Sequence, residues 1–176
     1  MNACHQQEIS VILDVVYNHF GPEGNYAGNF GPYFSQKYNT PWGKAINYDN
    51  AYSDNVRRYF IQNGLYWLSY YHIDCLRLDA VHGIFDMSAK HFLAELAEET
   101  LAFSQKQKRA YYLIAESDLN DIRLINTKEK GIPGIKLYCL LIMFCCPLEI
   151  ILVQIEIPQL IPGLGIIGIQ LKGLLN

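Results

Sequence analysis

Two carboxylates that each follow a short apolar run are the most informative feature of the sequence. Asp79 follows Cys75–Leu78, and Glu116 follows Leu113–Ala115. A strand that ends in a carboxylate places it at the rim of a sheet, and neighbouring strands lie ~5 Å apart. Retaining glycosidases need two carboxyl groups about 5–5.5 Å apart, one as nucleophile and one as acid/base. The pair therefore predicts glycoside chemistry.

Arg77 is the residue best placed to support Asp79. It stands two positions earlier, so the alternation of a strand puts both side chains on the same face. A neighbouring guanidinium keeps a carboxylate ionised and orients it. We therefore expect Arg77 and Asp79 to act together.

The segments that must position these residues alternate between strand and helix. Apolar runs predict strands at 9–15, 75–79 and 111–116, and helical spacing predicts helices at about 53–71 and 86–105. Strands joined by helices build a parallel sheet, whose closed form brings the carboxyl ends of all strands to one face. The sequence therefore predicts an α/β fold with Asp79 and Glu116 at one edge.

Each predicted helix has a candidate buried face. The first has Ser53 as its capping residue and presents Val56, Phe60, Trp67 and Tyr71 on one side. The second presents Ala89, Phe92, Leu93, Leu96, Thr100 and Phe103. Such stripes are typical of a hydrophobic core rather than of a ligand platform.

A long connection follows the first predicted strand. Residues 20–52 contain five Gly and three Pro among many Tyr and Asn. A loop of this length inside a compact domain is usually functional. Because it follows the carboxyl end of a strand, we expect it to lie over the active face.

Three short motifs carry a resemblance to a known family. They are Asp14–His19, Leu76–Ala80 and Ala115–Asp118, in that order along the chain. They resemble the first three signature regions of the α-amylase family of glycoside hydrolases. The resemblance covers roughly residues 5–130 and implies part of a (β/α)8 barrel, with its third, fourth and fifth strands present.

The loop narrows the resemblance to one branch of that family. Asn18–Tyr26, Phe30–Phe34 and Thr40–Gly43 are similar to segments of the malto-oligosyltrehalose trehalohydrolases. The implied reaction is hydrolysis of the α-1,4 bond next to the terminal trehalose of a maltooligosyl-trehalose. Pullulanases and isoamylases share Asp14–His19 and much of the loop, so an α-1,6 debranching enzyme is the alternative within this class. A non-catalytic, pseudogene-like remnant is the alternative outside it.

The resemblance also implies a role for each candidate site residue. Asp79 is the nucleophile and Glu116 the general acid/base. The substrate-binding residues are Arg77, His19, His82, Tyr17, Asp118 and Asp121. Asp14 and Asn18 hold loops together. No metal site and no cofactor are implied, and the expected partner is a malto-oligosaccharide with a trehalose end.

Composition removes several other classes of function. The net charge is −3 and no basic stripe suggests nucleic acid. Five cysteines show no metal-ligand spacing and leave an odd one over, which is typical of reduced cytosolic thiols. The first residues are polar and do not resemble a signal peptide. We therefore expect a cytoplasmic protein that binds neither nucleic acid nor membrane.

The chain divides into two unlike parts, 1–131 and 132–176. The second holds four charged residues, and 21 of its 45 residues are Ile or Leu. It could be a membrane span within Leu137–Val153, a buried barrel segment, or an out-of-frame or mispredicted gene end; the third interpretation explains best why the family motifs stop.

A complete barrel takes ~250 residues, and neither the fourth signature region nor its third catalytic Asp is found. We therefore expect a fragment that is inactive by itself and that ends in an irregular apolar tail.

Overall fold

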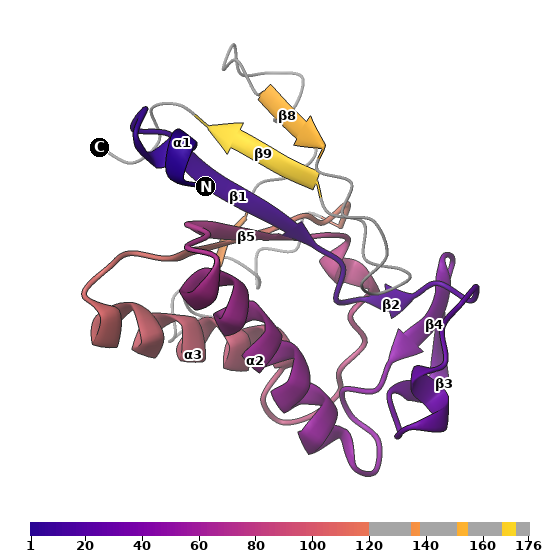
Figure 1. Cartoon of the computed structure of the whole chain (residues 1–176). Helices are drawn as coiled ribbons and strands as arrows, with labels where there is room; N and C mark the ends of the chain where they lie inside the picture. The colour runs from indigo at the N-terminus through magenta and orange to yellow at the C-terminus, as the bar shows by residue number, and fades with distance from the viewer. Residues whose placement is uncertain (120–134, 138–150, 155–166, 172–176) are drawn as a thin grey trace.

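The computed structural model describes residues 1–119, 135–137, 151–154 and 167–171 (Figure 1). The helices are α1 (Asn2–His5), α2 (Ser53–Tyr70) and α3 (Phe92–Gln107), with short 3-10 turns η1 (Ala27–Asn29) and η2 (Val81–Gly83). The strands are β1 (Ser10–Val15), β2 (His19–Phe20), β3 (Phe34–Thr40), β4 (Gly43–Ile46), β5 (Cys75–Leu78), β6 (Tyr112–Ala115), β7 (Ile135–Leu137), β8 (Ile151–Gln154) and β9 (Ile167–Leu171).

The three predicted strands are confirmed as β1, β5 and β6, and they are parallel neighbours in one sheet. Asp14 pairs with Arg77, and Leu78 pairs with Ala115. Because β5 and β6 end level with one another, the residues that follow them, Asp79 and Glu116, emerge at the same edge. The α/β class and the placement of both acids therefore agree with the prediction.

The outer strands of this sheet differ from the prediction. The order is β7-β6-β5-β1-β9-β8, with β7 parallel to β6 but β9 antiparallel to β1 and β8 antiparallel to β9. The tail is therefore not wholly irregular, since it contributes three strands. A parallel barrel would place a parallel strand beside β1, so the described sheet is a parallel core with an antiparallel edge.

Helices α2 and α3 lie side by side beneath this sheet (Figure 1). Val56 and Phe60 of α2 are buried as expected, but Trp67 is only partly buried and Tyr71 is exposed. The true buried face continues through Ile61, Gly64 and Leu68. Ser53 does not cap the helix, because the N-cap is Tyr52 in a left-handed conformation and no side-chain capping bond forms.

Helix α3 begins at Phe92 rather than near residue 86. The Asp86 carboxylate accepts hydrogen bonds from the backbone N–H of Phe92 at 2.6 Å and of Ser88 at 2.9 Å. The intervening segment therefore wraps around a buried carboxylate instead of starting a helix. Ala89, expected in the helix core, is exposed as a result.

A buried arginine joins the two helices and this segment. Arg57 of α2 donates to Asp86 at 2.6 Å, to Glu95 of α3 at 2.7 Å and to the carbonyl oxygens of Tyr48 and Lys90. The Arg57 side chain is 8% exposed and that of Asp86 is fully buried. Removing one partner of such a pair leaves an uncompensated buried charge.

We expect Arg57→Met to lower the free energy of unfolding by about 3–5 kcal/mol. The matched control is Lys90→Met, which removes an exposed ion pair to Glu98 of 2.5 Å and is expected to cost no more than about 1 kcal/mol. Urea unfolding followed by circular dichroism measures both. Equal losses for the two variants would contradict the assignment of Arg57 as a buried anchor.

The long connection is more ordered than a loop. Strands β2, β4 and β3 form a small antiparallel sheet, which lies beyond the carboxyl ends of β1 and β5 (Figure 1). The lack of a side chain at Gly43 allows β4 to lie close to β2, because a Cβ at this position would be 2.5 Å from the Phe20 carbonyl oxygen. The prediction that this connection lies near the active face is correct, and it contains a small sheet where the sequence pattern predicts a loop.

Among the residues that the structure describes, none of the helices is long and apolar enough to cross a bilayer. Most of Leu137–Val153, the segment considered above for a membrane span, lies outside those residues, as does the boundary near residue 131.

Candidate active site

Arg77 lies at the centre of the candidate site and contacts three carboxylates. Its Nη2 is 2.7 Å from Glu116 Oε2, and its Nη1 is 3.5 Å from Asp79 Oδ1. The same Nη1 also pairs with Asp14. The structure therefore brings the two predicted catalytic acids to one guanidinium, as the alternation along β5 suggested for Asp79.

Backbone hydrogen bonds continue past the strand ends and fix the two acids. The Asp79 N–H donates to the Val15 carbonyl and the Glu116 N–H to the Leu78 carbonyl, both at 3.0 Å. The chain then turns sharply at Ala80, whose φ is +41°, an unusual value for a residue with a side chain. This turn lets the Ala80 N–H donate to Glu116 Oε2 at 3.2 Å.

The two acids differ in their environments. The Asp79 side chain is 33% exposed and that of Glu116 is 15% exposed. Glu116 accepts from the Ala80 N–H and pairs with Arg77, whereas Asp79 accepts from the Asn18 amide at 3.4 Å and is farther from Arg77. Carboxylates that share a site can take different roles when their surroundings differ, and here the more open one is Asp79.

Asp14 is the third carboxylate on Arg77, and it is almost completely buried. Burial raises its pKa to about 6, although the Arg77 charge opposes this shift. Its Oδ1 is buried without a hydrogen-bond partner within the described part of the chain. Asp14 therefore binds the Arg77 guanidinium from the side of the core. Asp79 and Glu116 contact the same guanidinium from the side of the candidate active site.

The raised pKa of Asp14 predicts a pH-dependent stability. The folded protein binds this proton more tightly than the unfolded chain, whose value is near 3.8. The contribution is therefore fully present below pH 3.8 and is lost as the pH rises through about 6, with a total on the order of 3 kcal/mol. Urea unfolding of the protein and of Asp14→Asn at several pH values measures it: the stability difference between them should fall across this window. Parallel pH profiles would contradict the prediction.

Asn18 contributes more to the site than loop support. Its amide donates to the Asp79 carbonyl oxygen at 2.7 Å and also reaches the Asp79 carboxylate. Its oxygen contacts Nδ1 of His19. Asn18 therefore fixes the backbone and the side chain of Asp79 while orienting His19.

A ring cluster borders the acids on the side of the small sheet. Trp42 lies with its ring centre 5.7 Å from that of His19 and 5.9 Å from that of His82. Burial lowers the pKa of His19, and the Asp79 charge opposes this. The sequence had marked Trp42 only as part of Thr40–Gly43, so its place at the site is new.

The remaining predicted binding residues are not all at the site surface. Tyr17 is 1% exposed and donates its hydroxyl to Asn63 at 2.7 Å, so its ring is not available to stack on a sugar. Asp118 is exposed and lies 3.9 Å from His82 Nε2. Asp121 lies outside the described residues. Within those residues, no cluster of three or more His, Cys, Asp or Glu could hold a metal ion.

Comparison with known proteins finds close relatives for most of the chain. A malto-oligosyltrehalose trehalohydrolase from Saccharolobus solfataricus is 51% identical over 130 residues, 74% of this chain and 22% of that protein. One from Arthrobacter ramosus is 48% identical over 128 residues, 73% of this chain and 22% of that protein. The chain thus spans about a fifth of the length of these relatives.

A solved structure assigned as an α-amylase from Salmonella typhimurium matches with a TM-score of 0.65 at 42% identity, over 77% of this chain and 23% of that one. No protein-family model matches the chain. The relatives nevertheless confirm the predicted resemblance: over about three quarters of its length, this chain is similar to the malto-oligosyltrehalose trehalohydrolases, glycoside hydrolases of the α-amylase family.

Proposed function

We propose that the protein carrying this chain hydrolyses the α-1,4 bond next to the terminal trehalose of a maltooligosyl-trehalose, and so serves trehalose biosynthesis in the cytoplasm. The observation that carries the proposal is the bridge from Arg77 to Asp79 and Glu116 at the ends of two neighbouring parallel strands. A double-displacement glycosidase needs two carboxyl groups close together, one as nucleophile and one as acid/base, and a shared guanidinium on neighbouring strands supports that pairing. The names of the relatives support the substrate.

In the first step, an Asp79 oxygen attacks the anomeric carbon while Glu116 gives its proton to the departing glycosidic oxygen. The bond to trehalose breaks, and a covalent glycosyl-Asp79 ester forms. In the second step, Glu116 takes a proton from water as the water oxygen attacks the same carbon. The ester bond breaks, the malto-oligosaccharide leaves with its original anomeric configuration, and both acids return to their starting states.

The neighbours of the acids have defined parts in this scheme. Arg77 pairs with the carboxylates of both Asp79 and Glu116 and fixes their positions relative to one another. Asn18 fixes the orientation of Asp79. His19, His82 and Trp42 lie beside the acids, where sugar hydroxyls and ring faces would pass. We place activity in the longer protein, because this chain spans only 22% of its relatives and the third carboxylate expected of the family is not identified in it.

The test is the product formed by the complete protein. Maltotriosyl-trehalose should yield free trehalose and maltotriose, with the α-anomer of maltotriose appearing first by NMR. Release of linear chains from pullulan or glycogen without trehalose formation would instead favour the debranching alternative. Turnover of neither substrate class by the folded, complete protein would favour the non-catalytic remnant.

A further inference from the structure

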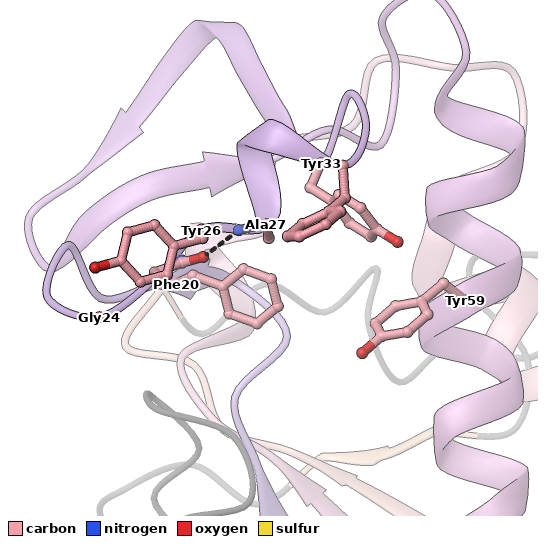
Figure 2. A pocket seen from close by; sticks show the side chains of 8 residues that line it. Phe20, Gly24, Tyr26, Ala27, Tyr33 and Tyr59 are labelled. Carbon is pink, nitrogen blue, oxygen red and sulfur yellow. Dashed lines mark hydrogen bonds between the residues drawn. The ribbon is translucent and has the colours of Figure 1, made fainter.

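A second candidate site lies on the far side of β2 from the acids. It is a pocket of about 320 Å³ that is lined by the rings of Phe20, Tyr26, Phe30, Tyr33 and Tyr59 together with Asn25 (Figure 2). We call it the aromatic pocket. Tyr59 comes from α2, and the other residues come from β2 and the segment before β3.

Strand geometry separates the aromatic pocket from the catalytic face. His19 and Phe20 are consecutive in β2, so their side chains point to opposite faces. The His19 ring lies 5.7 Å from Trp42 beside the acids, whereas the Phe20 ring lies 5.8 Å from Phe60 of α2. The pocket therefore lies on the opposite face of β2 from the candidate active site, and neither Asp79 nor Glu116 lines it.

Three of the residues that line the pocket are held by interactions within the fold. Asn25 donates its amide to the Gly21 carbonyl at 3.2 Å and accepts from the Ala27 N–H at 3.0 Å, the bond drawn in Figure 2. Tyr33 and Tyr59 meet edge to face with ring centres 5.6 Å apart. A ligand that contacts these three residues meets side chains that the fold already holds in place, which favours its affinity.

Two of the rings nevertheless remain open to solvent. Tyr26 is 69% exposed and Phe30 is 83% exposed. Exposed aromatic rings at the mouth of a concave pocket with a few polar groups are typical of a binding site. The available polar groups are the hydroxyls of Tyr26, Tyr33 and Tyr59, and none of the lining residues is charged. This chemistry suits a neutral ligand with apolar faces and hydroxyl edges, not an anion or a cation.

We propose that the aromatic pocket binds a segment of an α-1,4-linked glucan at a point separate from the bond that is cleaved. A pyranose ring presents C–H groups on its faces and hydroxyls around its edge, which match the rings and the phenolic groups. The choice of an α-glucan rests on the proposed function, since a long malto-oligosaccharide has sugar units to spare beyond the scissile bond.

Nitration of tyrosine tests the proposal without any substitution. Tetranitromethane modifies accessible tyrosines, and peptide mass spectrometry gives a rate for each. Maltoheptaose, titrated to about 20 mM, should slow the nitration of Tyr26, Tyr33 and Tyr59, by about tenfold once its concentration is ten times Kd. Tyr66 and Tyr70, which are exposed on α2 outside the pocket, serve as internal controls and should not change.

Four outcomes would overturn the proposal. The pocket tyrosines could show no protection, or be protected only to the same extent as Tyr66 and Tyr70, or be protected equally by cellohexaose, whose β-1,4 linkage gives a different chain shape. If another segment of a longer protein fills the pocket, the same tyrosines will resist nitration with and without sugar, which also overturns the proposal.

A pair of matched variants locates the binding. Tyr59→Leu removes a wall of the pocket, and we expect it to raise the maltoheptaose concentration for half-protection of Tyr26 about tenfold. Tyr66→Leu, on the same helix but outside the pocket, should leave that concentration unchanged. Loss of protection in both variants would point to a general effect on the fold and contradict the assignment.

The experiment is repeated in Asp79→Asn, which cannot form the glycosyl ester. Protection of the pocket tyrosines should persist in this variant, because binding here does not use the catalytic acids. The two proposals can therefore fail separately. Absence of trehalose release by the unmodified complete protein contradicts the proposed function, whereas absence of tyrosine protection in Asp79→Asn contradicts glucan binding in the aromatic pocket.

Discussion

Replacing Glu116 with Gln in the complete protein is expected to lower kcat/KM for maltooligosyl-trehalose on the order of 10²–10⁴-fold. The amide occupies nearly the same space and can still accept from the Ala80 N–H, but it has no proton to give to the departing oxygen. Asp79→Asn should cost at least as much, because it removes the nucleophile itself. Chromatographic measurement of the released trehalose gives kcat/KM for both variants.

The two variants differ on a substrate whose leaving group needs no proton. With α-maltosyl fluoride, Glu116→Gln should still form the glycosyl ester and release a burst of about one fluoride per site, followed by slow turnover because the general base is lost. Asp79→Asn should give no burst. Glu98→Gln is the control, since it makes the same chemical change at an exposed carboxylate on α3, and it should stay close to the unmodified protein. A burst from Asp79→Asn would exclude Asp79 as the nucleophile.

The positions of these acids could be predicted from the sequence because the end of a strand is marked by residues that are neighbours in the sequence. An apolar run followed by a carboxylate marks the rim of a sheet, and β5 and β6 do end at Leu78 and Ala115 as expected. The link from Arg77 to Asp79 also followed from alternation within one strand. The contact between Asn18 and Asp79 did not, because it joins segments 61 residues apart.

Errors arose where a polar group or a small residue lies inside the core. The start of α3 is delayed because Asp86 draws the backbone of Phe92 and Ser88 toward its carboxylate. The buried face of α2 includes Arg57 and Gly64, which no hydrophobic pattern marks. Tyr17 was expected to bind substrate, yet it is buried and its hydroxyl donates to Asn63 inside the fold. The buried positions of Arg57, Gly64 and Tyr17 depend on residues far away in the sequence, and hydrophobic periodicity carries no information about such partners.

The tail, residues 132–176, shows that amino-acid composition alone does not predict which segments form strands. Its apolar character favoured an out-of-frame or mispredicted gene end, and this remains a prediction. The antiparallel pairing of β9 with β1 is compatible with it, because a parallel barrel would place a parallel strand there. Reading the flanking DNA in all frames tests the idea: recovery of further family-like strands in a shifted frame supports it, and their absence contradicts it.

Arg77→Met should be the most destabilising single change at the site. The variant leaves Asp14 buried beside Asp79 and Glu116 with no cation between them. Breaking a buried pair by removing one partner typically costs about 3–5 kcal/mol, and we expect a loss of this size at pH 7 in urea unfolding. The control is Arg109→Met, whose partner Asp74 also receives hydrogen bonds from His5 and the Val11 N–H, so the loss should be about 1 kcal/mol or less.

The pH dependence of this loss separates electrostatics from packing. In Arg77→Met, Asp14 can relieve the uncompensated charge by taking up a proton, which burial already favours, since it holds the pKa of Asp14 near 6 even beside Arg77. The destabilisation should therefore shrink between pH 7 and pH 4.5. Arg77→Lys keeps a charge but lacks the planar fork that reaches three carboxylates, so it should recover only part of the stability. A loss for Arg77→Met that is the same at both pH values would show that packing, rather than the charge shared by the three carboxylates, sets the contribution of Arg77.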